Sequence, residues 1–172
     1  MCSKISPENC FKKKVYSRKI IVNVAENINN FTNKKVNTKV IFISTDQVFN
    51  DKQKPFTKET IPKPENIFGK LMFEAENIYL KNKNNLIFRH GFVFGIGRFG
   101  SLRGMIHSEI NNHKEQSLLD DSRKIYPISS RYFVKRILSE VENNTNGIAH
   151  VSGIDNSSKY KLTKDIFQSL NL

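Results

Sequence analysis

Cysteine is scarce in this chain of 172 residues: only Cys2 and Cys10 occur, without the spacing of a disulfide framework or a zinc site. We therefore expect reduced thiols in a reducing compartment, which favours the cytoplasm. The start of the sequence lacks the apolar segment of a signal peptide, and no apolar run approaches the roughly 18 residues of a membrane span. These absences predict a soluble protein with no membrane segment.

Acidic residues are few beside basic ones: 16 Asp and Glu stand against 28 Lys and Arg, giving a net charge of +12. Such an excess could attract nucleic acid. However, only Lys12, Lys13 and Lys14 form a run, and the other basic residues are scattered among asparagines. No helix-turn-helix, RNP-like strand or zinc-finger spacing is present. The charge indicates solvated surface, and weak electrostatic nucleic-acid binding stays only a second alternative function.

Helical and strand-like segments alternate along the sequence. One or two helices are expected over 8–36, where apolar residues recur at intervals of three to five, namely Val15, Ile20, Val24, Ile28 and Phe31. Further helices are expected from Asn66 onward, over 101–112, from Ser129 or Ser130 to Val141, and after Ser157 or Ser158. Strands are expected over 40–44, 85–89, 116–119 and 147–152, the first of them buried on both faces. Pro55, Pro62 and Pro64 mark a loop over 53–64. The order predicts one α/β domain, residues 1–172, with a parallel sheet.

The most informative segment runs from VIFISTDQVFN to PENIFGKLMFEAE, residues 40–76. An apolar strand ends on Ser44, Thr45 and Asp46, and about twenty residues later a helix opens through Asn66 and Gly69. This layout closely resembles the extended short-chain dehydrogenase/reductase superfamily, in particular the sugar-nucleotide reductases of the dTDP-4-dehydrorhamnose reductase type. The resemblance implies a partial Rossmann-like parallel sheet with flanking helices and a small C-terminal portion of a substrate domain. It covers the later two thirds of a full-length relative, without the first βαβ cofactor unit.

In the resembled family a Ser or Thr orients the substrate carbonyl, and a Tyr-x-x-x-Lys pair on the helix supplies the proton. Thr45 matches the Ser/Thr position, whereas Phe68 and Met72 stand at the Tyr and Lys positions. Glu74 or Glu76 matches the acidic residue that closes the motif. Since Phe68 has no hydroxyl and Met72 no charge, only Thr45 is chemically competent. General acid catalysis contributes about 10²–10⁴-fold, so the chain is predicted to be an impaired or inactive reductase.

The resemblance also implies a substrate site, a cofactor and partners. Candidate substrate-binding residues are Asp46, Gln47, Asn66, Arg89, Arg98 and Arg103. The family uses NADP(H) or NAD(H), but this chain is predicted to bind neither, and its four histidines lack the spacing of metal ligands. Gly95, Gly97 and Gly100 match a Gly-x-Gly-x-x-Gly pattern, which we interpret as a turn lining a sugar-nucleotide cleft rather than a dinucleotide loop. Tyr160 and Lys164 repeat the Tyr-x-x-x-Lys spacing outside the motif's context, and we interpret them as surface residues.

Two functions follow. The first is a sugar-nucleotide reductase of dTDP-rhamnose or related biosynthesis, impaired or inactive, with a nucleotide sugar as candidate ligand. The alternative is a non-catalytic binding or regulatory subunit, like the β subunit of methionine adenosyltransferase in the same superfamily. The absent strands would leave a sheet edge open to a protein partner or a second copy.

Overall fold

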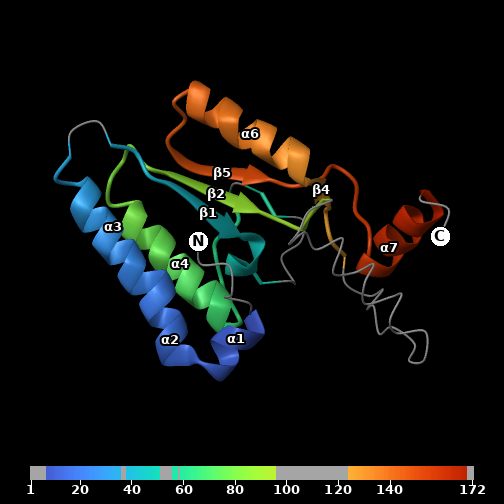
Figure 1. Ribbon diagram of the computed structural model, residues 1–172, viewed down its shortest axis with the longest axis horizontal. Helices are drawn as coiled ribbons and strands as arrows, with labels where there is room; N and C mark the ends of the chain where they lie inside the picture. Colours follow the sequence, from blue (N-terminus) through green and yellow to red (C-terminus); the bar gives the residue numbers. More distant parts are fainter. Residues whose placement is uncertain (1–6, 36–37, 51–55, 58, 96–123, 170–172) are drawn as a thin grey trace. The chain divides into compact units, whose positions relative to one another are not determined.

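The computed structural model describes residues 7–35, 38–50, 56–57, 59–95 and 124–169, and these divide into two units (Figure 1). The first unit comprises Met1–His90 and Glu142–His150, and the second Gly91–Val141 and Val151–Leu172. The helix expected over 101–112 and the strand expected over 116–119 lie outside the described residues. The single domain expected for the whole chain stays a prediction.

The first unit begins with a helical segment in four pieces. These are α1 (Pro7–Lys12), α2 (Lys14–Arg18), the π-helical turn η1 (Lys19–Asn23) and α3 (Val24–Thr32). The helical segment predicted over 8–36 is therefore confirmed as far as Thr32, after which the chain turns. Its core-facing residues include Cys10, Ile21, Val22 and Ala25.

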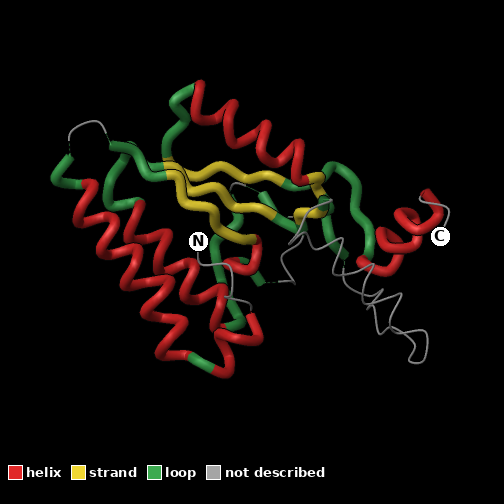
Figure 2. The backbone as a smooth tube through the Cα atoms, in the orientation of Figure 1, coloured by secondary structure: helices red, strands yellow, loops and turns green. Residues whose placement is uncertain are grey.

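The remaining elements of this unit are β1 (Ile41–Thr45), the 3₁₀ turn η2 (Asp46–Val48), α4 (Ile67–Tyr79), β2 (Leu86–His90) and β5 (Gly147–Val151). The three strands form one sheet in the order β1-β2-β5 (Figure 2). β1 and β2 are parallel, with Ile41 opposite Leu86 and Thr45 opposite His90. The predicted parallel α/β arrangement is confirmed, and within the described residues β1 is an edge strand.

The core of the first unit lies between α4, the helices α1–α3 and one face of the sheet. Leu71, Met72, Ala75, Ile78 and Tyr79 of α4 are buried, as the apolar arc of this helix predicts. The prediction that β1 is buried on both faces is wrong, because Ile43 is 38% exposed. Side chains alternate along a strand, so Phe42 and Ser44 face α4, whereas Ile43 points to the opposite face.

The second unit contains β3 (Val93–Phe94), β4 (Ile128–Ser129), α6 (Ser130–Glu142) and α7 (Lys159–Ser169). β3 and β4 pair in parallel, a contact that the sequence did not predict. Both predicted helix starts are confirmed. Ser129 Oγ accepts a hydrogen bond from Tyr132 N (3.3 Å), and Ser158 Oγ accepts one from Lys161 N (3.0 Å). None of the described helices is long and apolar enough to cross a membrane.

Burial of Tyr79 predicts a loss of stability at alkaline pH. Burial raises the pKa of its phenol, so the folded state favours the neutral form. The stabilisation is complete below the unfolded pKa of about 10 and is lost as pH rises from there towards the folded pKa. Urea unfolding between about pH 8 and 11 measures the free energy of unfolding. It should fall more steeply with pH in the wild type than in Tyr79→Phe. Tyr16→Phe, at an exposed position, is the control and should show the same dependence on pH as the wild type.

Candidate functional site

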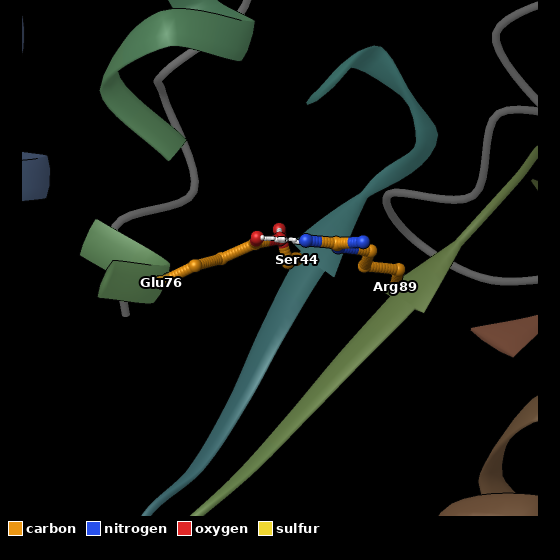
Figure 3. Close-up of polar contacts among 3 residues, drawn as sticks. All are labelled: Ser44, Glu76 and Arg89. Atoms are coloured by element: carbon orange, nitrogen blue, oxygen red, sulfur yellow. Dashed lines mark hydrogen bonds and ion pairs between the residues drawn. The ribbon is translucent and has the colours of Figure 1, made fainter. Parts of the chain in front are cut away.

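A buried ion pair connects α4 to the sheet beside the predicted site (Figure 3). Arg89 Nη2 lies 2.6 Å from Glu76 Oε2, and Arg89 Nε lies 3.0 Å from Glu76 Oε1. Ser44 Oγ donates a further hydrogen bond to Glu76. Glu76 and Arg89 are 0% and 5% exposed, and the Arg89 guanidinium carbon lies 5.0 Å from the centre of the Phe49 ring. The pair holds α4 against the ends of β1 and β2.

Thr45 ends β1 and caps the turn that follows it. Its Oγ1 accepts a hydrogen bond from Gln47 N (3.2 Å) and donates one to Asp46 Oδ1 (3.3 Å). Thr45 is buried, whereas Asp46 and Gln47 are partly exposed. The hydroxyl predicted to orient a substrate carbonyl therefore also orders η2, which carries two of the predicted substrate-binding residues.

Asn66 brings the start of α4 to the same turn. Its Oδ1 accepts a hydrogen bond from Gly69 N (2.7 Å), which caps the helix, and its Nδ2 donates one to Gln47 Oε1 (3.1 Å). Gly69 permits this approach, since a Cβ there would lie 2.1 Å from Gln47 O. The structure thus brings together Thr45, Gln47 and Asn66, and their role in binding a substrate stays a prediction.

Phe68 and Met72 belong to the hydrophobic core of the first unit. Met72 is buried in the core cluster, and Phe68 is partly buried and packs against it. These two positions therefore supply apolar contacts and present neither a hydroxyl nor a charge.

The family follows from a comparison with known families. Residues 8–172 match the model described as the RmlD substrate binding domain. The chain belongs to the RmlD substrate binding domain family. It is 25% identical over 144 residues to "Methionine adenosyltransferase 2 subunit beta" of Rattus norvegicus, covering 77% of this chain and 42% of that protein. The Danio rerio protein of the same name is 25% identical over 143 residues, covering 77% of this chain and 44% of that protein. The chain thus spans less than half the length of these curated relatives.

Solved structures give the same family context. A hypothetical dTDP-4-dehydrorhamnose reductase from Sulfolobus tokodaii is 26% identical, with a TM-score of 0.80 over 95% of this chain and 57% of that one. The dTDP-4-dehydrorhamnose reductase of Bacillus anthracis, solved with NADP, is 21% identical, with a TM-score of 0.85 over 97% of this chain and 59% of that one. The similarity to the Bacillus anthracis structure shows that this chain shares its Rossmann-like fold.

Among the other predicted site residues of this RmlD-family chain, Arg89 is held by Glu76, and its contact with a substrate stays a prediction. Arg98 and Arg103 lie outside the described residues, as do Gly97 and Gly100. Gly95 is described, and a Cβ there would lie 2.1 Å from Ser130 Oγ, so it packs against the start of α6.

Sequence reasoning missed the pairing of Glu76 with Arg89. It offered Glu74 and Glu76 as equal matches to one motif position, but Glu74 forms a partly exposed ion pair with Arg18, which lowers the pKa of its carboxyl. A signal was available: Glu76 interrupts the apolar arc of α4, and Arg89 interrupts the apolar strand LIFRH. Charged residues in buried segments are usually paired.

Proposed function

We propose that this chain is a non-reducing member of the RmlD family that acts by binding. The observation that carries the proposal is the burial of Met72, with Phe68 packed beside it, at the two positions where the resembled reductases carry Tyr and Lys. Without that pair, α4 supplies neither the proton for a reduced carbonyl nor the charge that eases its transfer.

The residues present do not fit a nicotinamide dinucleotide. In the resembled family the Lys of the motif holds the nicotinamide ribose, whereas Met72 offers no hydrogen-bond donor and is enclosed by the core. We therefore propose that neither NADPH nor NADH is a cofactor of this chain, and we derive no reaction step through them.

Titration calorimetry with NADPH tests this part of the proposal. Up to roughly 1 mM NADPH, which corresponds to about 4 kcal/mol of binding free energy, we expect no saturable heat. A relative that is active as a dTDP-4-dehydrorhamnose reductase serves as the positive control. Saturable binding in the micromolar range would contradict the cofactor prediction.

A nucleotide sugar is the small-molecule ligand that we propose for this chain. The grouping of Thr45, Gln47 and Asn66 at the ends of β1 and the start of α4 supports it, because these polar groups converge in the layout that the motif implies. In α/β sheets, ligands bind beyond the carboxyl ends of the strands. Binding of a dTDP-sugar without turnover would agree with the proposed function.

A protein partner is the third element of the proposal. The curated relatives are named as subunits of methionine adenosyltransferase, and this chain is proposed to work as a subunit as well. Within the described residues β1 pairs only with β2, so its other edge is suited to a strand of a partner or of a second copy.

A further inference from the structure

Six apolar side chains of α1–α3 are exposed to solvent. They are Phe11, Val15, Tyr16, Val24, Ile28 and Phe31, and we call this set the outer stripe. Phe11, Tyr16 and Phe31 are 70%, 59% and 63% exposed. Four of the six residues are those whose spacing predicted a helix in this segment. The spacing therefore marks an exposed face rather than the core.

Four of the six residues of the outer stripe lie on one face of the helical segment. Tyr16, Val24, Ile28 and Phe31 follow one another at intervals of eight, four and three residues, which places them on one helical face. The π-helical turn η1 lies between the first two and adds a residue to the turn, which brings Tyr16 closer in line with α3. In Figure 1, α2 and α3 lie on the outer side of α4, away from the strands.

The outer stripe is large enough to be a binding surface. Its three aromatic side chains alone expose roughly 400 Å², since each aromatic side chain can bury about 150–250 Å². An exposed patch of a few hundred Å² often marks an interaction site, and a standard interface buries about 800 Å² per partner. The stripe would supply half of such an interface.

The charges around the outer stripe are almost all positive. Between residues 10 and 35 the sequence has six lysines, namely Lys12, Lys13, Lys14, Lys19, Lys34 and Lys35, but one acidic residue, Glu26, while Arg18 is paired with Glu74 of α4. This ratio far exceeds the 28 to 16 of the whole chain. Lysines stand at both ends: Lys14 Nζ lies 5.8 Å from the centre of the Phe11 ring, and Lys35 Nζ lies 5.7 Å from that of Phe31.

We propose that the outer stripe is the docking surface for an amphipathic helix of another protein, whose apolar stripe is bordered by aspartates and glutamates. The apolar residues would provide burial, and the lysines would pair with the acidic borders. A second copy fits less well, because an isologous contact through this face would bring two sets of lysines together. The proposal rests on the proposed function, as it names the kind of partner that a binding subunit would take.

Binding of a designed, fluorescently labelled peptide to the full chain tests the proposal and is measured by fluorescence anisotropy. The peptide is an amphipathic helix with a leucine stripe bordered by glutamates. We expect saturable binding that weakens with added salt. The same peptide with lysines in place of glutamates should bind at least about tenfold more weakly. Equal binding of the two peptides would overturn the proposal.

Substitutions locate the binding on the outer stripe. Phe31→Ser and Tyr16→Ser should each weaken binding of the acidic peptide about tenfold, as loss of an interface aromatic does. Lys14→Glu combined with Lys35→Glu should remove the preference for the acidic peptide. Ile154→Ser, at an almost fully exposed position of the second unit, is the matched control and should bind as the wild type does.

Wild-type affinity of Phe31→Ser, with a wild-type melting curve, would overturn the assignment of the surface. A dimer in sedimentation that Phe31→Ser disperses would assign the stripe to a second copy instead, and would also overturn it. Failure of this proposal is separable from failure of the proposed function, because the latter is measured as NADPH-dependent turnover, which no peptide result changes.

Discussion

Glu76→Gln should lower the free energy of unfolding by about 3–5 kcal/mol, because it leaves the Arg89 guanidinium buried without its counter-charge. Since a domain is stable by only about 5–15 kcal/mol, this is a large part of the total. Urea unfolding monitored by circular dichroism measures the change. The same substitution two residues earlier, Glu74→Gln, breaks a pair whose side chains are 50% and 40% exposed. It should cost no more than about 1 kcal/mol.

Glu74 and Glu76 both lie on α4 and both pair with an arginine, so the difference between the two substitutions measures the effect of burying the ion pair. Replacing both buried partners, in Glu76→Met with Arg89→Met, should restore much of the lost stability, because no unpaired charge remains. Equal effects of Glu74→Gln and Glu76→Gln would contradict the structural role given to the buried pair.

Gly69→Ala should destabilise the protein by about 1–3 kcal/mol or more, although alanine is ordinarily the better helix former by about 1 kcal/mol. The added Cβ would lie 2.1 Å from Gln47 O and 3.0 Å from Gln47 C, so the start of α4 must move away from η2. Thermal unfolding measures the loss. Lys70→Ala, at the exposed neighbouring position, is the control for a new alanine at the start of α4 and should leave stability nearly unchanged. A stabilised Gly69→Ala protein would show that η2 does not hold α4 closely.

The sequence motif predicted the most constrained part of the molecule well. A strand that ends at the Ser-Thr-Asp step and a helix that opens at Asn66 were both predicted, because each depends on residues that are close together in the sequence. The short pair β3 and β4 was not predicted, because a strand of two residues is too short to show the alternation of apolar and polar residues that marks a strand.

Contacts between distant segments were harder to predict. The apolar spacing of Val24, Ile28 and Phe31 correctly predicted a helix, but it could not tell which apolar face packs inward, and the core uses Ile21, Val22 and Ala25 instead. Likewise the choice between Glu74 and Glu76 depends on where α4 meets β2. The register of a helix on a sheet is a tertiary property.

Direct assay of carbonyl reduction tests the central proposal, that this member of the RmlD substrate binding domain family does not reduce a carbonyl. The full chain is incubated with NADPH and dTDP-4-dehydrorhamnose, NADPH oxidation is followed by absorbance, and an active dTDP-4-dehydrorhamnose reductase is run in parallel. We expect no NADPH oxidation above the rate without protein, since Phe68 and Met72 provide neither proton donor nor charge. Turnover that depends on both NADPH and the dTDP-sugar, and that Thr45→Val abolishes, would contradict it.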